Sequence, residues 1–213
     1  MDNIVIQVHH VTKTYGEIDV LKDVSLKLEK GKIYGLIGRN GSGKTMLMKT
    51  ICGFVSPTKG KVIVQGKELG RDIDIPKKMG VIIEQPGFLP GYSAYANLLF
   101  LSRINGTADK TDILNALNQV GLGNTGKKKV GKFSMGMRQR LGLAQALLEK
   151  PDILILDEPM NGLDDRAVDE IRQLLLKEKQ RGVTIIIASH NREDIEMLCD
   201  KVFQMENGKL VSR

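Results

Sequence analysis

Residues 38–45 read Gly38-Arg39-Asn40-Gly41-Ser42-Gly43-Lys44-Thr45 and match the pattern G-x-x-x-x-G-K-[ST]. The short apolar run Ile33–Ile37 precedes this stretch, and Lys44–Cys52 has the pattern of a helix that ends at Gly53. Glycines let the backbone wrap so that successive N–H groups face an anion at the N-terminus of the helix. A strand, a glycine-rich loop and a helix in this order predict a phosphate-binding loop rather than a chance turn.

The residues of this loop have distinct expected roles in binding ATP. Lys44 is expected to reach the β- and γ-phosphates, and the Thr45 hydroxyl is expected to ligate Mg²⁺. The remaining predicted ATP contacts come from the wrapped part of the loop, at Gly38, Asn40, Gly41, Ser42 and Gly43.

A second motif ends in two acidic residues. The run Ile153–Leu156 reads as a buried strand, and Asp157 and Glu158 follow it directly. At such a strand end, Asp157 is predicted to hold Mg²⁺. Successive strand residues face opposite ways, so Glu158 is predicted to point elsewhere and to orient or deprotonate the attacking water. The alternative, an exposed acidic turn, is disfavoured by the phosphate-binding loop in the same chain.

Strands and helices alternate along most of the chain, which predicts an α/β fold. We expect a P-loop ATPase core in residues 1–85 plus 134–213, with a mostly parallel sheet covered on both faces and an N-terminal antiparallel β part. Residues 86–133 are predicted to form an inserted helical subdomain. The expected strands are Ile4–Val8, Val20–Leu28, Ile33–Ile37, Val62–Val64, Val81–Ile83, Ile153–Leu156 and Thr184–Ala188, with a final hairpin over Phe203–Val211. The expected helices are Lys44–Cys52, Ser93–Ile104, Lys110–Val120, Ser134–Lys150, Asp164–Arg181 and Arg192–Leu198.

Composition indicates a globular chain without a membrane span. Hydrophobic residues make up 41% and charged residues 27% of the 213 residues, which is ordinary for a folded domain. The longest apolar runs are far shorter than the roughly 18 residues that a spanning helix needs. The start Met1-Asp2-Asn3 lacks the features of a signal peptide. The protein is therefore expected to stay in the cytosol, with any membrane role through a partner.

The net charge of +7 does not point to nucleic acid. The basic residues are scattered, their one run is Lys127–Lys129, and the aromatic residues (Tyr 4, Phe 5) are too few for a base-stacking platform. No nucleic-acid partner is expected. Cys52 and Cys199 fit no metal spacing and are predicted to be buried thiols, and His9 and His10 match no motif.

Three further motifs follow in a defined order. Residues 133–140 read Phe133-Ser134-Met135-Gly136-Met137-Arg138-Gln139-Arg140, Asn161-Gly162-Leu163-Asp164 comes just after the acidic strand end, and His190 ends the next strand. Together with the two motifs above, this order closely resembles the ATP-binding cassette family, whose ATPase subunits drive membrane transporters. The resemblance covers essentially the whole chain.

The resemblance implies a head-to-tail dimer in which each chain holds half of each of two shared active sites. Ser134 and Gly136 would contact the γ-phosphate bound to the loop of the second copy, although Ser134 also suits a plain helix N-cap. His190 resembles the switch histidine of the family, which contacts the γ-phosphate and the water. Asp164 resembles the residue that communicates across the dimer, with helix capping as the alternative. Tyr15 matches the aromatic residue that stacks on adenine, with a stray surface tyrosine as the alternative.

The chain departs from the family pattern at several positions. Glu84 stands where Gln is usual and is predicted to take part in binding Mg²⁺, while Gln85 is the alternative if the match slips by one residue. Met135 and Met137 replace a small and a polar residue, which leaves the anion contact intact. Met160 stands where Thr or Ser is usual.

These features look most like the bacitracin-export and lantibiotic-immunity branch, whose members pair with separately encoded membrane subunits. The resemblance implies an ATPase that uses ATP and Mg²⁺ and drives export of antimicrobial peptides or drugs. Its implied partners are a second copy of itself or a related ATPase subunit, and integral membrane subunits that hold it at the inner face of the cell membrane.

Two other function classes are possible for such a cassette. One is a soluble ATPase that acts in DNA repair or translation, but those members carry long coiled coils or tandem cassettes, whereas each motif occurs once here. The other is a cassette that only binds nucleotide, which would lack Glu158 or His190. No C-terminal regulatory domain is expected after the Phe203–Val211 hairpin. Transport is favoured.

Overall fold

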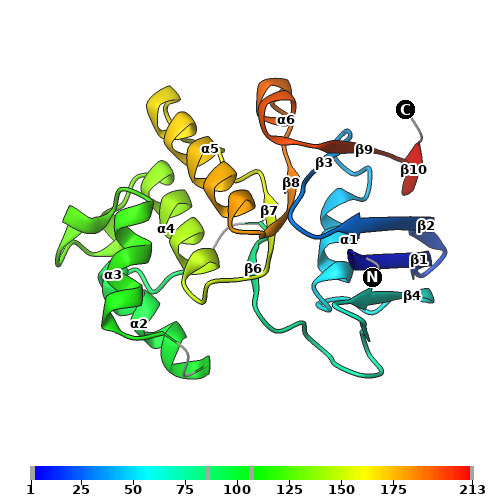
Figure 1. Ribbon diagram of the computed structural model, residues 1–213, viewed down its shortest axis with the longest axis horizontal. Helices are drawn as coiled ribbons and strands as arrows, with labels where there is room; N and C mark the ends of the chain where they lie inside the picture. Colours follow the sequence, from blue (N-terminus) through cyan, green and yellow to red (C-terminus); the bar gives the residue numbers. More distant parts are fainter. Residues whose placement is uncertain (1–2, 85–86, 106–107, 212–213) are drawn as a thin grey trace.

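Two sheets and six α-helices make up the computed structural model, which describes residues 3–84, 87–105 and 108–211 (Figure 1). The strands are β1 (Ile4–Tyr15), β2 (Ile18–Glu29), β3 (Ile33–Ile37), β4 (Lys59–Val64), β5 (Lys67–Glu68), β6 (Met79–Ile82), β7 (Ile153–Asp157), β8 (Thr184–Ala188), β9 (Lys201–Glu206) and β10 (Lys209–Val211). The helices are α1 (Lys44–Ile51), α2 (Ala94–Asn105), α3 (Lys110–Gln119), α4 (Met135–Leu147), α5 (Asp165–Gln180) and α6 (Arg192–Leu198). Within these described ranges, no helix has both the length and the apolar character needed to cross a membrane.

The larger sheet is mostly parallel. Its strand order is β10-β9-β3-β8-β7-β6, and β10 is the strand that pairs antiparallel with its neighbour. The smaller sheet has the order β2-β1-β4-β5, and all its pairs are antiparallel. The predicted α/β fold, with a mostly parallel sheet and an antiparallel N-terminal part, is therefore confirmed.

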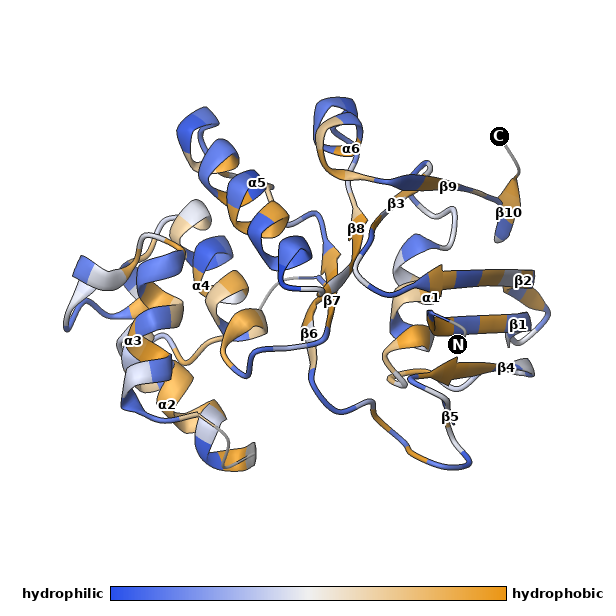
Figure 2. Cartoon of the chain, in the orientation of Figure 1, coloured by the Kyte–Doolittle hydropathy of each residue, from blue (hydrophilic) through white to orange (hydrophobic). Residues whose placement is uncertain are grey.

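Alternate residues of the central strands enter two separate cores. In β7, Leu154 and Leu156 pack in the core formed with α4 and α5, whereas Ile153 and Ile155 pack in the core formed with α1 and the smaller sheet. Side chains alternate between the two faces of a strand, so both faces of the larger sheet are covered. Figure 2 shows that orange (hydrophobic) and blue (hydrophilic) residues alternate along α5, as expected for a helix with one buried face.

Helices α2, α3 and α4 lie together at the end of the molecule away from the smaller sheet (Figure 1). Their buried residues Leu98, Ile113 and Leu141 belong to one core, which also includes residues of β7 and β8. The predicted inserted subdomain, residues 86–133, contains α2 and α3. Its boundary at residues 85 and 86 lies outside the described residues, so the division stays a prediction.

Some element boundaries differ from those predicted. β1 continues to Tyr15 instead of ending at Val8, because an irregular register around His10 (φ 48°) carries the strand through a polar stretch. α4 ends at Leu147 instead of Lys150, whose φ of 49° is incompatible with a helix. The bounds of β3, β8 and α6 are those predicted.

Both cysteines are free thiols, as predicted. Cys52 is buried and Cys199 is half-buried. Burial raises the pKa of both thiols to about 12. They therefore stay protonated, and unreactive, at neutral pH.

A buried charge network connects α5 to the start of α6. Arg172 Nη2 lies 2.7 Å from Asp194 Oδ1, and the two side chains are only 6% and 2% exposed. Asp194 Oδ2 accepts a hydrogen bond from Ser189 Oγ at 3.1 Å, and Ser189 Oγ accepts one from the Asn191 N–H at 3.1 Å. The network therefore holds both sides of the turn that carries His190.

We expect Arg172→Met to lower the free energy of unfolding by ~3–5 kcal/mol, because it leaves the Asp194 carboxylate buried without its cation. Arg192→Met is the matched control, since Arg192 is 89% exposed and pairs with Glu196 on the surface of α6. It should cost within ~0.5 kcal/mol. Urea unfolding followed by far-ultraviolet circular dichroism measures both, and equal losses would contradict the buried network.

Candidate active site

The phosphate-binding loop spans residues 38–43, between β3 and α1. Gly38, Gly41 and Gly43 have φ values of 150°, 77° and 105°, a region that favours glycine. A Cβ atom on Gly38 would also collide with the Met205 carbonyl oxygen. The glycines therefore provide both the curvature of the loop and its close packing on β9.

Lys44 bridges the two ends of the loop. Its Nζ donates to the Gly38 carbonyl oxygen at 2.7 Å and to the Arg39 carbonyl oxygen at 3.1 Å. These carbonyl groups hold the ammonium at the mouth of the loop, where α1 begins. An anion bound at the helix N-terminus would meet this ammonium directly.

Thr45 and Asp157 meet across the site although they come from distant parts of the sequence. Thr45 Oγ1 donates to Asp157 Oδ2 at 2.8 Å. Thr45 lies in the first turn of α1, and Asp157 ends β7. The hydroxyl and the carboxylate are thus adjacent, as the sequence predicts for two ligands of one metal ion.

The donor set at this point fits Mg²⁺. Mg²⁺ prefers oxygen ligands and usually takes one or two from the protein, completing its shell with water and substrate phosphates. Across the described ranges, no group of three or more His, Cys, Asp and Glu side chains could hold a metal alone. The Ser42 Oγ atom is buried and has no hydrogen-bond partner among the described residues. Thr45 and Asp157 therefore suit a metal that is shared with a phosphate ligand.

A cavity of about 550 Å³ opens beside the loop. This volume lies within the range of small-molecule sites. The predicted site residues that line it are Asn40, Gly41, Ser42, Gly43, Lys44, Thr45, Glu84, Asp157 and Glu158. The predicted site residues outside its lining are Tyr15, Gly38, Ser134, Gly136, Asp164 and His190. Residues that line it without having been predicted are Val20, Met46, Met135, Gln139 and Asn161.

Glu158 and His190 are brought together at the rim of this cavity. Glu158 Oε2 lies 2.8 Å from His190 Nδ1. Glu158 has a φ of 49°, a left-handed conformation that is costly for a non-glycine residue and is concentrated at functional sites. Its N–H donates to the Ala188 carbonyl oxygen of β8 at 2.9 Å. The turn after β7 is therefore shaped to direct this carboxylate toward the end of β8.

Gln139 supports the site, although its sequence pattern did not predict it as a site residue. Its Nε2 donates to the Glu158 carbonyl oxygen at 3.1 Å, which links α4 to the strained turn. The signal was present, because Gln139 lies three residues after Gly136 in the same motif. Only the packing of α4 beside β7 shows which backbone group it contacts.

Ser134, Gly136 and Asp164 lie at an exposed corner outside the cavity lining. Ser134 Oγ accepts from the Met137 N–H at 3.2 Å, and Asp164 Oδ1 accepts from the Ala167 N–H at 2.8 Å, so both residues are helix N-caps. A Cβ atom on Gly136 would come 2.8 Å from the Gly162 carbonyl oxygen. Within one chain, Ser134 and Asp164 therefore act as helix N-caps, which is the alternative to their predicted roles in the dimer.

Tyr15 ends β1 on the protein surface. Its side chain is 50% exposed, and Lys13 Nζ lies 4.9 Å from the ring centroid. Its role as an adenine platform stays a prediction.

Glu84 lies on the cavity wall and is paired with a lysine of α1. Glu84 Oε1 lies 2.6 Å from Lys49 Nζ, and the φ of Glu84 is 62°. The pairing with Lys49 offsets part of the negative charge that Glu84 adds beside Asp157 and Glu158. The alternative residue, Gln85, lies outside the described residues.

Comparison with known proteins places this geometry in a family. A family model described as ABC transporter matches residues 21–161. An ABC transporter ATP-binding protein of Bacillus subtilis (strain 168), YybJ, is 49% identical, over 96% of this chain and 94% of its own length. The lantibiotic transport ATP-binding protein SrtF of Streptococcus pyogenes is 42% identical, over 97% and 89% of the two chains. The bacitracin transport ATP-binding protein BcrA of Enterococcus faecalis is 43% identical, over 97% and 68%.

Solved structures agree with the fold. A dimeric bacterial ABC transporter cassette, MJ0796, has a TM-score of 0.87 at 24% identity and covers 97% of both chains. The relatives confirm the predicted resemblance to the bacitracin and lantibiotic branch, and they give no support to the alternative in DNA repair or translation. The chain belongs to the ABC transporter family, as one of its ATP-binding and ATP-hydrolysing subunits.

Proposed function

We propose that this chain powers an exporter of antimicrobial peptides or similar drugs, as a head-to-tail dimer with a second copy of itself or a related subunit. It works at the inner face of the cell membrane, through separate integral membrane subunits. The observation that carries the ATPase part is the 2.8 Å contact between Glu158 and His190 at the rim of a cavity lined by Lys44, Thr45 and Asp157. The choice of cargo rests on the names of SrtF and BcrA.

The loop and Lys44 bind the phosphates of ATP. Lys44 exchanges its bonds to the Gly38 and Arg39 carbonyl oxygens for bonds to phosphate oxygens, which are stronger because both partners are charged. Thr45 and Asp157 would hold Mg²⁺, which when bound would supply positive charge to stabilise the phosphates. Glu84, which lines the same cavity, would contribute to the metal environment.

Glu158 and His190 act on the water and the γ-phosphate. Glu158 orients the water and accepts its proton, which is the role of a general base. Its contact with His190 Nδ1 and the Gln139 bond to its carbonyl oxygen fix the position of the carboxylate. The His190 side chain is 76% exposed, so the imidazole is open to a nucleotide at the cavity rim.

The second copy completes the site. Ser134 and Gly136 lie outside the lining of their own chain's cavity, and Ser134 is exposed at the N-terminus of α4. A helix N-terminus attracts anions through its unpaired N–H groups. In a head-to-tail dimer this terminus faces the γ-phosphate in the loop of the other copy, and Asp164 lies close to the same interface.

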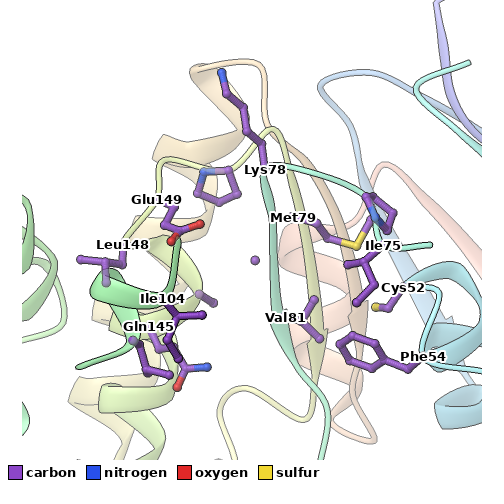
Figure 3. Close-up of a pocket in the computed structure, with 15 residues that line it drawn as sticks. Cys52, Phe54, Ile75, Lys78, Met79, Val81, Ile104, Gln145, Leu148 and Glu149 are labelled. Atoms are coloured by element: carbon purple, nitrogen blue, oxygen red, sulfur yellow. The ribbon is translucent and has the colours of Figure 1, made fainter. Parts of the chain in front are cut away.

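An apolar groove of about 300 Å³ is the proposed docking surface for the membrane subunit. Figure 3 shows Phe54, Ile75 and Val81 on one wall, facing Ile104 and Leu148 on the other. Phe54, Ile75 and Ile104 are 54%, 59% and 79% exposed, an exposure typical of apolar contact surfaces. One wall includes β6, which leads to Glu84 two residues later. An apolar segment of the membrane subunit in this groove would therefore contact the strand that leads into the ATP site.

We expect Glu158→Gln to bind ATP but to hydrolyse it at least ~100-fold more slowly, because a general base is removed while the phosphate contacts stay. The variant should accumulate as an ATP-bound dimer in gel filtration with ATP and Mg²⁺. A variant that stays monomeric and hydrolyses normally would refute both the catalytic role and the dimer.

Mixed dimers test the shared site. We expect Lys44→Ala and Ser134→Arg subunits to be inactive alone and to recover ATPase activity when mixed. In a head-to-tail dimer, one site then carries both changes and the other carries neither. Lys44→Ala mixed with Asp157→Ala is the matched control, because these residues belong to the same half-site and leave no site intact. Recovery in the control, or none in the test pair once mixed dimers are shown to form, would contradict shared sites.

Phe54→Glu tests the groove. The purified variant should hydrolyse ATP normally, because Phe54 lies outside the ATP cavity. In cells that co-express a candidate integral membrane subunit, less of the variant should sediment with the membranes, since a charge would be buried at the contact. Met197→Glu, at a 52% exposed position on α6 outside the groove, is the control. Equal sedimentation of Phe54→Glu and wild type would argue against this docking surface.

A further inference from the structure

The C-terminal hairpin packs against the back of the phosphate loop. β9 pairs in parallel with β3, so that Ile37 lies opposite Gln204. The chain then turns at Asn207-Gly208 into β10 (Figure 1). The turn residues have φ values of 48° and 82°, which is the backbone of a tight two-residue hairpin. This turn lies next to the loop rather than free in solvent.

Gly208 joins the phosphate loop to β2 through two backbone hydrogen bonds. Its N–H donates to the Ser42 carbonyl oxygen at 2.9 Å. Its carbonyl oxygen accepts from the Lys22 N–H at 2.8 Å. One residue of the hairpin is therefore bonded on one side to the loop and on the other side to the smaller sheet.

The position favours glycine for two separate reasons. The φ of 82° strains any residue with a Cβ atom. A Cβ atom would also lie 2.6 Å from the Val20 carbonyl oxygen. That same oxygen would lie 3.1 Å from a Cβ atom on Gly43. The hairpin, β2 and the phosphate loop are thus packed backbone against backbone around Val20.

The bond to Ser42 sets the direction of the next N–H group. Ser42 O and the Gly43 N–H belong to one planar trans peptide, in which the two groups point in opposite directions. Because Gly208 holds Ser42 O from behind, the Gly43 N–H is turned toward the opposite side, where Gly43 lines the ATP cavity.

We propose that Gly208 is a positioning residue for ATP binding, which holds the Ser42–Gly43 peptide so that the Gly43 N–H faces the phosphates. The inference rests on the proposed ATP site. A residue in the last strand pair thereby controls the phosphate loop, about 165 positions earlier in the chain, without touching the nucleotide.

The chain contains a matched control for this residue. The β4–β5 hairpin turns at Gln65-Gly66, with φ values of 50° and 78°. A Cβ atom on Gly66 would meet no atom within 4 Å. Gly66→Ala therefore introduces the same backbone strain as Gly208→Ala but no contact with β2 or the phosphate loop.

Titration with a fluorescent ATP analogue tests the proposal. We expect Gly208→Ala to weaken binding by about tenfold, a change that corresponds to 1.4 kcal/mol. Gly66→Ala should bind within about twofold of wild type. Hydrogen–deuterium exchange without nucleotide gives a second readout: peptides spanning residues 38–45 should exchange faster in Gly208→Ala only. A general loss of stability would instead speed exchange in peptides throughout the chain, and not chiefly in the phosphate loop.

The outcomes separate this proposal from the proposed function. Wild-type affinity and loop exchange in a folded Gly208→Ala variant would overturn the positioning role while leaving the ATP site intact. A wild-type protein that binds no ATP would overturn the proposed function, and loop exchange would still decide the positioning role. If Gly208→Ala does not fold, Asn207→Ala strains the same turn more mildly and should weaken binding about threefold, against Gln65→Ala as its control.

Discussion

The parallel register of β3, β8 and β7 is the constraint on which the site depends. Leu36 on β3 lies opposite Ala188 on β8, which lies opposite Asp157 on β7. This alignment brings the phosphate loop, the His190 turn and the acidic strand end to one edge of the sheet, where ligands bind in open α/β sheets. A slip of one residue would send every side chain of a strand to the opposite face, so the two apolar cores that fix the register also fix the site.

The strained positions lie where these strands end. Glu158 has a left-handed backbone, and its cost is met by bonds from its N–H to β8 and from Gln139 to its carbonyl oxygen. The next strand end is held by the buried Arg172–Asp194 pair through Ser189. Glu158 and His190 therefore lie on turns that are held in place by helices of the same core. These contacts maintain the 2.8 Å distance between Glu158 and His190, and catalysis requires such precise positioning.

The residues that shape the phosphate loop pack inside the chain, whereas the residues proposed to contact partners lie on its surface. The phosphate loop packs on one side against β2, β9 and the β9–β10 turn, so contacts within the chain set its conformation. By contrast, Ser134, Asp164 and the apolar residues Phe54 and Ile104 are exposed. Ser134 and Asp164 lie within three residues of the cavity-lining residues Met135 and Asn161. An internally packed loop beside exposed contact surfaces suits the proposed work with partner subunits.

Local sequence was enough to predict the phosphate loop, the Asp157 strand end and most elements, because glycine patterns, apolar runs and N-caps act over a few residues. It also assigned Thr45 and Asp157 to Mg²⁺, and the structure brings the two side chains within 2.8 Å of each other. Only the tertiary structure decided the contacts of Gln139 with Glu158, Arg172 with Asp194 and Gly208 with Ser42. Those pairs are far apart in the chain, and their meeting depends on how helices and strands pack, which no local pattern encodes.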